Sequence, residues 1–209
     1  MSSKTVISNL AISNLGVGKE IQDFDTDPSE EAQACRRYYD ITLESTLRAF
    51  PWPFATKTVD LALIEENPTT EWAYSYRYPS DCLWAKRMLS GVRNDSRQTR
   101  SPYRILKDVS GKIIYTDEQF AKLEYTQRVE DPTYYSSDFI LAFAFRLAAY
   151  VAPRLSKGDP FGMRQSNIGL YEAEISSAKA AALNEQQDEE LPNSEFDRVR
   201  PSDYERSRY

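Results

Sequence analysis

The sequence of 209 residues contains no histidine and only two cysteines. Without histidine, the chain lacks the commonest general base and the commonest transition-metal ligand. Two cysteines cannot build a four-thiolate zinc site. Because Cys35 and Cys82 lie far apart in sequence, we expect two buried thiols, and one disulfide between them is the alternative. The sequence therefore predicts no cofactor, no metal and no enzymatic activity; the one enzymatic alternative is a hydrolase built from carboxylates.

The chain also lacks an apolar run long enough to cross a membrane, which takes about 20 residues. Its longest apolar stretch, Phe139–Ala152, contains Arg146 and falls short of that length. Near the start of the chain, Ser8 and Asn9 interrupt the apolar residues that follow Lys4. We therefore expect no signal peptide and no membrane contact, and we expect the protein in a reducing cytoplasm or in a particle assembled there.

The net charge is −6, and hydrophobic residues make up 41% of the chain. That hydrophobic content is enough for one domain with a core. A negative net charge disfavours a protein that wraps nucleic acid by neutralising its phosphates. It suits a subunit of an assembly, or a wall past which DNA slides without binding.

Helical periodicity marks several segments. Phe139–Ala152 is rich in Leu and Ala and apolar on nearly every side, so we expect a central helix that other helices cover. Ser136–Asp138 offers its N-terminal cap. A first helix is expected over Lys4–Leu15, and a last helix follows Pro160. Their expected inner faces are Ile7, Leu10, Ala11 and Asn14 in the first, and Ile168, Tyr171, Ile175, Ala178 and Ala182 in the last.

The second helix has the clearest start signal in the chain. Asp27 is expected to cap it, with Pro28 in the first turn and Glu30 reaching back to the free N–H groups. The prolines of Pro51–Phe54 end this helix, and the two aromatic rings of that segment are expected to close the end of the helical bundle. The residues expected on the inner face are Ala32, Cys35, Tyr39, Leu43, Thr46 and Phe50.

Strand-like patterns follow the second helix. Thr58–Glu65 predicts one strand, and Trp72–Tyr78 predicts its partner. A short helical turn is expected over Cys82–Trp84, because Pro-Ser-Asp precedes it as a cap. The turn Asp108–Gly111 predicts a hairpin between the strands on either side, and Phe120–Val129 predicts a further strand.

The fold prediction is therefore α+β, mainly α. Residues 1–187 are expected to form a four-helix bundle with a small antiparallel β insertion at about 57–130. From Asp188 the composition becomes charged and almost free of apolar residues, so residues 188–209 predict an extended C-terminal tail. Aromatic and arginine side chains along this tail suit folding onto a partner, and a solvated end is the alternative. These side chains are Phe196, Arg198, Arg200, Tyr204 and Tyr209.

Two motifs partly match known ligand sites. The three aspartates of residues 23–27 resemble the start of a calcium loop, but Pro28 and Ala34 occupy the positions of its Gly and its final Glu. A helix cap explains Asp27 without a metal. Gly16–Lys19 lacks the spaced Gly and the Ser or Thr of a phosphate-binding loop, so helix termination explains it.

One region of the chain is basic. Because the whole chain is acidic, we interpret this region as a solvated loop or a contact with a protein. The alternative is a nucleic-acid-binding module that uses Arg93–Lys107. The residues of the region are Arg87, Arg93, Arg97, Arg100, Tyr103, Arg104 and Lys107.

A set of short motifs resembles one family. Asn-Leu-Gly after the first helix is followed by Cys35–Tyr39, Cys-Arg-Arg-Tyr-Tyr, and by Pro51–Ala55, Pro-Trp-Pro-Phe-Ala. Tyr-Pro-Ser-Asp-Cys-Leu at 78–83, the Ala-rich helix and Tyr-Glu-Ala at 171–173 complete the set. Over about residues 4–187, the chain resembles the head–tail adaptor (connector) proteins of tailed bacteriophages, the group that includes tail tubular protein A.

The resemblance implies a structural virion protein with no catalytic residue. Such adaptors form a ring, usually of twelve copies, beneath the portal protein. The ring extends the channel, through which genomic DNA passes without sequence-specific binding, and it offers an attachment surface to a tail nozzle or tail-tube protein. This places the protein at the head–tail interface of the virion, after assembly in the host cytoplasm.

The resemblance also implies roles for two sets of residues. The tail 188–209 would be a portal-docking arm, and part of the basic region would contact a tail protein, a neighbouring subunit or DNA. The implied anchors of the arm are Phe196, Arg198, Arg200, Tyr204 and Tyr209, and the implied contacts of the basic region are Arg93, Arg97, Arg100, Tyr103 and Arg104.

Overall fold

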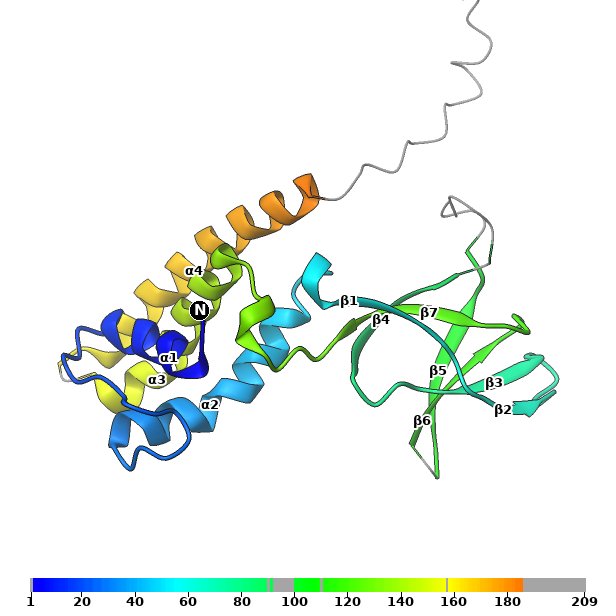
Figure 1. The fold of residues 1–209 in the computed structure, drawn as a ribbon, viewed down its shortest axis with the longest axis horizontal. Helices are drawn as coiled ribbons and strands as arrows, with labels where there is room; N and C mark the ends of the chain where they lie inside the picture. Colours follow the sequence, from blue (N-terminus) through cyan, green and yellow to red (C-terminus); the bar gives the residue numbers. More distant parts are fainter. Residues whose placement is uncertain (1, 90, 92–99, 110, 157, 186–209) are drawn as a thin grey trace, which may run out of the picture.

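The computed structural model describes residues 2–89, 91, 100–109, 111–156 and 158–185. These residues form four α-helices and seven β-strands, and the strands make two antiparallel sheets. Figure 1 shows the helices gathered at one end of an elongated molecule and the strands at the other. We call these parts the helical body and the β unit. The α+β class is confirmed.

The helical body is organised around α3, which contacts each of the other three helices. Its side chains at Phe139, Phe143 and Leu147 are all 0% exposed, so the predicted central helix is confirmed. The Ser136 hydroxyl caps α3 by accepting a hydrogen bond from the Phe139 N–H. The helices are α1 (Lys4–Ser13), α2 (Glu30–Leu47), α3 (Ser137–Leu155) and α4 (Pro160–Asn184). None of the described helices is long and apolar enough to cross a membrane.

The inner face of α1 matches the predicted one in part, because Ile7 and Ala11 are buried as expected. Ser8 and Ile12 are buried, whereas Leu10 is 36% exposed. The Asn9 side chain accepts a hydrogen bond from the Ile21 N–H and donates one to the Ile21 carbonyl. These two bonds hold the following loop against the Asn9 side of α1. The buried face of α1 is therefore rotated about the helix axis by one residue relative to the predicted face.

The aromatic segment after α2 forms the junction between the two parts. Trp52 is 1% exposed, and its indole N–H donates to the Thr46 carbonyl at 3.1 Å. Its ring meets that of Phe139 edge-on at 5.1 Å. A short 3₁₀ turn, Pro53–Ala55, then leads directly into the first strand. The prediction that Trp52 closes the helical body is confirmed.

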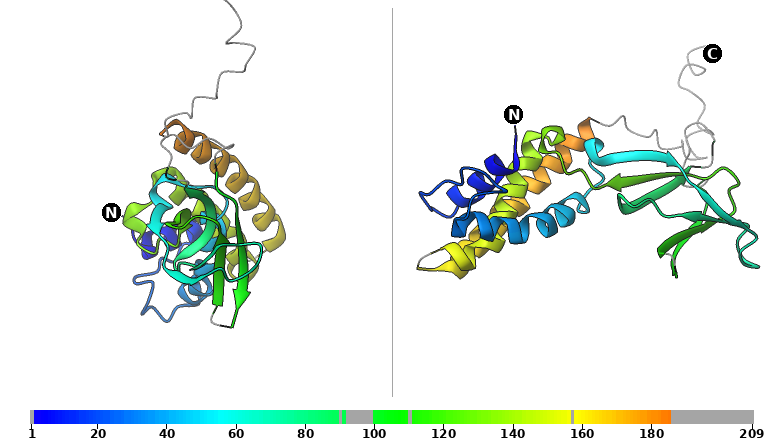
Figure 2. Two further views of the ribbon diagram at one scale, coloured as in Figure 1. Left: turned by 90° about the vertical axis from the view of Figure 1, so that its right-hand side faces the viewer. Right: turned by 60° about the horizontal axis from the view of Figure 1, so that its bottom comes forward.

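The β unit has its own core, which includes Tyr76, Met88, Ile114, Leu123 and Tyr125. One sheet has the order β1-β7-β4 and the other β2-β3-β6-β5, with every pair antiparallel. The right view of Figure 2 shows the β unit beyond the end of the helical body. The strands are β1 (Thr56–Asp60), β2 (Leu63–Glu66), β3 (Tyr74–Arg77), β4 (Cys82–Leu89), β5 (Tyr103–Asp108), β6 (Gly111–Thr116) and β7 (Lys122–Gln127).

This β unit corrects the predicted four-helix bundle with a small β insertion, which fits the structure poorly. The strands lie between α2 and α3 in the chain, as predicted, but with two sheets and a separate core they form a second body rather than a small insertion. In addition, α4 continues beyond the end of α3 in Figure 1, so the helices do not form a regular bundle. The predicted hairpin around Asp108–Gly111 is confirmed, as is the strand predicted within Phe120–Val129.

The predicted partner strand within Trp72–Tyr78 is confirmed as β3, which pairs with β2. One strand prediction and one helical-turn prediction were wrong. The strand expected over Thr58–Glu65 is two strands in different sheets, because the chain crosses between the sheets at Leu61 and Ala62. The Leu61 N–H donates to Ala121 next to β7, whereas the Ala62 carbonyl accepts from Arg77 in β3. The helical turn expected over Cys82–Trp84 is the start of β4, because the pairing of this segment with β7 prevails over the local cap signal.

Candidate interaction surfaces

The predicted anchors of the C-terminal arm all lie outside the described residues, and so do Arg93 and Arg97 of the basic region. Their roles stay predictions. The anchors are Phe196, Arg198, Arg200, Tyr204 and Tyr209. The described members of the basic region belong to the β unit or lie next to β5.

The described residues of the basic region make contacts within the chain. The Arg104 guanidinium lies 3.7 Å from the Glu71 carboxylate, and both side chains are exposed. Tyr103 packs against the β core, and its hydroxyl donates to the Ala85 carbonyl at 3.2 Å. Arg100 also interacts within the chain. Of these contacts, the one between Arg104 and Glu71 pairs opposite charges, and it is long and exposed.

Arg87 takes part in a half-buried ion-pair cluster between β4 and β7. The Glu124 carboxylate lies 2.8 Å from the Arg87 guanidinium and 2.6 Å from the Lys86 ammonium. Burial of Glu124 raises its pKa, but hydrogen bonds from both cations outweigh burial and hold the pKa below its ordinary value. The cluster fixes two neighbouring strands, so Arg87 has a structural role.

A second ion-pair cluster joins the β unit to the helical body. Arg128, just after β7, lies 2.8 Å from Glu44 and 3.3 Å from Asp40, both on α2, and 3.2 Å from Glu130. No local pattern in the sequence indicates this cluster, because the partners on α2 are more than eighty positions away in the chain. The cluster borders a pocket of about 220 Å³ lined by Lys4, Tyr39, Asp40, Leu43, Arg128 and Glu130.

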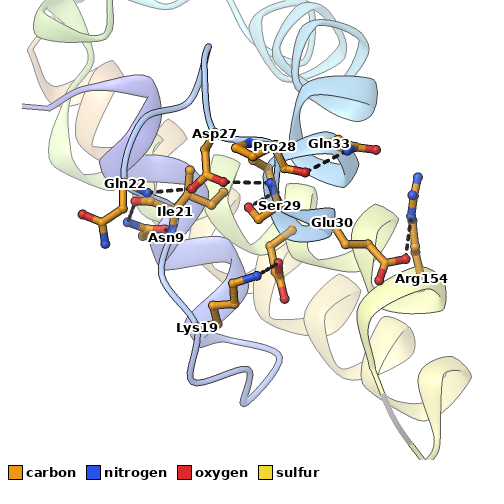
Figure 3. Close-up of polar contacts among 12 residues, drawn as sticks. Asn9, Lys19, Ile21, Gln22, Asp27, Pro28, Ser29, Glu30, Gln33 and Arg154 are labelled. Carbon is orange, nitrogen blue, oxygen red and sulfur yellow. Dashed lines mark hydrogen bonds and ion pairs between the residues drawn. The ribbon is translucent and has the colours of Figure 1, made fainter.

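The aspartate-rich loop before α2 folds through hydrogen bonds to its own backbone, as Figure 3 shows. The Asp27 carboxylate accepts from the Ser29 N–H at 2.8 Å and from the Gln22 N–H at 3.0 Å. These bonds lower the pKa of Asp27 to about 2. The cap of α2 is Ser29, whose hydroxyl accepts from the Ala32 N–H, so the prediction that Asp27 caps α2 was wrong.

Further contacts hold this loop against the helices. Arg36 donates to the Phe24 carbonyl at 2.6 Å and to the Asp27 carbonyl at 2.8 Å. On the other side, Lys19 pairs with Glu31 at 3.0 Å (Figure 3). Across the described part of the chain, no three histidine, cysteine or carboxylate side chains are grouped to hold a metal ion.

A pocket of about 170 Å³ lies between α3 and α4. The Arg146 guanidinium donates to the Tyr171 hydroxyl at 3.0 Å and lies 4.9 Å from the centre of its ring. Arg164 lies 5.9 Å from the ring centre of Tyr150. Ligand pockets usually have volumes of about 300–1,000 Å³, so this pocket and the one beside Arg128 are too small for a typical cofactor or substrate.

Both cysteines are buried and free, as the sequence analysis expected. Cys35 belongs to the core of the helical body and Cys82 to the core of the β unit. Burial raises the pKa of the Cys35 thiol to about 11, and burial also raises the pKa of Cys82. The two thiols lie in different cores, which is the buried-thiol arrangement and not the disulfide alternative.

The chain was compared with models of known protein families and with the sequences of curated proteins, and neither comparison gives a match. The functional interpretation therefore depends on the surfaces described above and on the sequence motifs.

Proposed function

We propose that this protein is a structural virion protein, a head–tail adaptor of a tailed bacteriophage. In this role, copies of the chain form a ring beneath the portal protein, extend the DNA channel and carry a tail nozzle or tail-tube protein. The observation that carries the proposal is the position of Pro51–Ala55, the most specific motif of the resemblance. This segment lies at the junction between the helical body and the β unit, with Trp52 buried in the helical core.

The arrangement of two separately cored parts supports this role. A ring subunit needs one surface that contacts its neighbours and another that receives the next component of the assembly. An elongated chain with a helical body at one end and a β unit at the other can separate these tasks (Figure 1). The ion-pair cluster around Arg128 bridges the two parts, so the subunit would present both surfaces in a fixed relation.

The charge and the tail also agree with an adaptor. A net charge of −6 suits a channel wall that repels DNA and lets it slide. The tail 188–209 follows α4 and has a composition that does not support independent folding. If the arm orders only on the portal, the entropy cost of ordering is met at that step, and assembly becomes sequential.

The test is addition to purified portal rings, followed by electron microscopy. The full chain is expected to add a ring of density to the portal. A chain without residues 188–209 is expected to add none, while its circular dichroism stays helical. Full addition by the shortened chain would contradict the docking role of the arm, and no addition by either chain would contradict the adaptor proposal.

A matched pair of full-length variants refines this test. Replacing Phe196, Arg198, Arg200 and Tyr204 with alanine is expected to weaken portal binding, because large aromatic and arginine side chains dominate protein interfaces. Replacing Ser194 and Ser202 with alanine changes the same tail without removing an anchor, and binding is expected to stay as in the unmodified chain. An equal loss of portal binding in both variants would show that the four named residues are not specific anchors for the portal.

A further inference from the structure

The sheet β2-β3-β6-β5 ends in two strands with no further strand beside them among the described residues. Near the start of β5, Ser101 forms a single antiparallel bridge with Met88 of β4, so the open part of the β5 edge is its later part. An unpaired edge presents backbone N–H and C=O groups that another strand can pair with. Both strands belong to the β unit, away from the helical body in Figure 1. Each edge is therefore a potential contact with a further chain.

Both edge strands expose large apolar side chains. In β2, Leu63 is 48% exposed and Ile64 is 44% exposed. In β5, Ile105 is 38% exposed and Leu106 is 41% exposed. Adjacent exposed apolar residues on a strand edge favour association, because pairing removes them from water.

The charges on the two edges are opposite in sign. The exposed residues Glu65 and Glu66 follow the apolar pair in β2, whereas Arg104 and Lys107 flank the apolar pair in β5. The last residue of β5, Asp108, is acidic and leaves that strand with one net positive charge. Lys107 also lies directly opposite Lys112 in the β5–β6 register, and like charges in that position repel. The one carboxylate paired with Arg104, Glu71, is exposed and 3.7 Å away, so it forms a weak pair.

The strand directions suit pairing between copies. Every neighbouring pair in this sheet is antiparallel, so β2 and β5 run in opposite directions. A second copy placed beside the first in the same orientation therefore presents its β2 antiparallel to β5 of the first. A register that pairs Glu66 with Arg104 aligns residues 63–66 with residues 104–107 and joins the two sheets.

We propose that the β2 edge of one copy pairs with the β5 edge of a second copy of this chain. Pairing β5 with β5 over residues 104–107 would set Arg104 against Lys107, and antiparallel pairing of β2 with β2 over residues 63–66 would set both glutamates against apolar side chains. The edge charges therefore favour the head-to-tail contact. A head-to-tail contact repeats until it closes into a ring or extends as a filament. This inference deepens the proposed adaptor role. It rests on that role only for the expectation that the contact closes into a ring; the contact between the two edges does not depend on it.

Two charge-reversal variants test the contact. In E65K/E66K both edges carry basic residues, and in R104E/K107E both carry acidic ones. Each variant alone is expected to associate more weakly than the unmodified chain by about tenfold or more, because like charges then face each other. An equimolar mixture is expected to restore association, because each edge then meets an edge of opposite charge.

Association is measured by sedimentation velocity at low salt over a range of protein concentrations, and circular dichroism checks that each variant is folded. The matched control E20K/E185K makes the same change of charge at two exposed positions outside the β unit. It is expected to associate as the unmodified chain does.

The outcomes separate this inference from the adaptor proposal. The unmodified chain staying monomeric at every concentration, or a mixture that fails to associate although both variants are folded, would overturn the edge contact. Charge-reversed variants that still form complete rings on the portal would also overturn it and leave the adaptor proposal standing. Association through the edges without any binding to portal rings would leave the edge contact standing and contradict the adaptor proposal.

Discussion

The guanidinium of Arg128 lies 2.8 Å from the carboxylate of Glu44, although the two residues are 84 positions apart in the chain. Arg128 follows β7, and Glu44 belongs to α2. Their contact joins the β unit to the helical body where the chain returns from one to the other. Asp40 and Glu130 extend it into a network around a guanidinium whose side chain is about one third exposed.

We expect Arg128→Met to lower the free energy of unfolding by about 1 kcal/mol, since a network of several charges stabilises more than an isolated surface pair. Methionine keeps much of the apolar stem and removes the charge. The matched control is Lys122→Met, because Lys122 forms a single exposed pair with Asp60 at 3.0 Å. Its expected effect is below about 0.5 kcal/mol. Urea unfolding measures both values, and equal effects would rule out the special role of Arg128.

Trp52 is the buried aromatic side chain at the junction between the helical body and the β unit. Its indole is 1% exposed, packs against Phe139 and donates a hydrogen bond to Thr46. We expect Trp52→Ala to destabilise the chain by about 3–5 kcal/mol, the usual cost of removing a buried tryptophan. Trp52→Phe keeps an aromatic ring and is expected to lower the free energy of unfolding by less. It is the variant to measure if the alanine variant does not fold. Trp84→Ala is the control: Trp84 is 41% exposed, and thermal or urea unfolding should show a small change.

The Asp27 carboxylate makes stability depend on pH. Two backbone hydrogen bonds lower its pKa from an ordinary value of 3.8 to about 2 in the folded chain. A lowered pKa in the folded state means that its stabilising contribution is present above about pH 4. The contribution is lost as the pH falls from about 4 to about 2, because the unfolded chain takes up a proton on this carboxylate in that range while the folded chain keeps it ionised.

Asp27→Asn removes that ionisation. We expect the variant to be less stable at neutral pH and to lose less of its remaining stability between about pH 4 and pH 2. The control is Asp25→Asn, because the Asp25 carboxylate accepts no hydrogen bond from the described residues. Urea unfolding at a series of pH values measures the effect. The same acid dependence in the Asp27 variant and in the unmodified chain would contradict this assignment.

The sequence predicted the features that depend on local chemistry. The apolar run around Phe143 indicated the central helix, and the turn residues Asp108–Gly111 indicated the hairpin. These signals are local, because helix periodicity and turn geometry involve residues within a few positions of one another.

The features that the sequence analysis missed depend on distant partners. Cys82–Trp84 follows a good helix cap, but it is a strand because β7 pairs with it from about forty positions away. Likewise, no local pattern shows that Arg128 meets α2 or that Glu124 meets Lys86. Strand pairing and long-range ion pairs come from tertiary packing, which prevails over local propensity. The anchors of the tail lie outside the described residues, so they stay predictions.

The single charge in the apolar part of α3 links that helix to α4. The Arg146 guanidinium donates to the Tyr171 hydroxyl at 3.0 Å and lies 4.9 Å from the ring centre. We expect Tyr171→Phe to lower the free energy of unfolding by about 1 kcal/mol, since it removes one hydrogen bond and keeps the ring. Arg146→Met is expected to cost more, because it removes that bond, the contact with the ring and the weaker bond to Thr46 at 3.4 Å.

A double-mutant cycle isolates the coupling between the two residues. We expect an interaction energy of about 0.5–1.5 kcal/mol from urea unfolding of the single and double variants. The neighbouring pair Arg164 and Tyr150 provides the control cycle, since it is more exposed and its guanidinium lies farther from the ring, at 5.9 Å. Its coupling should stay below about 0.5 kcal/mol. If the two cycles gave the same coupling, Arg146 would not be a specific link between α3 and α4, and burial of apolar side chains alone would hold the two helices together.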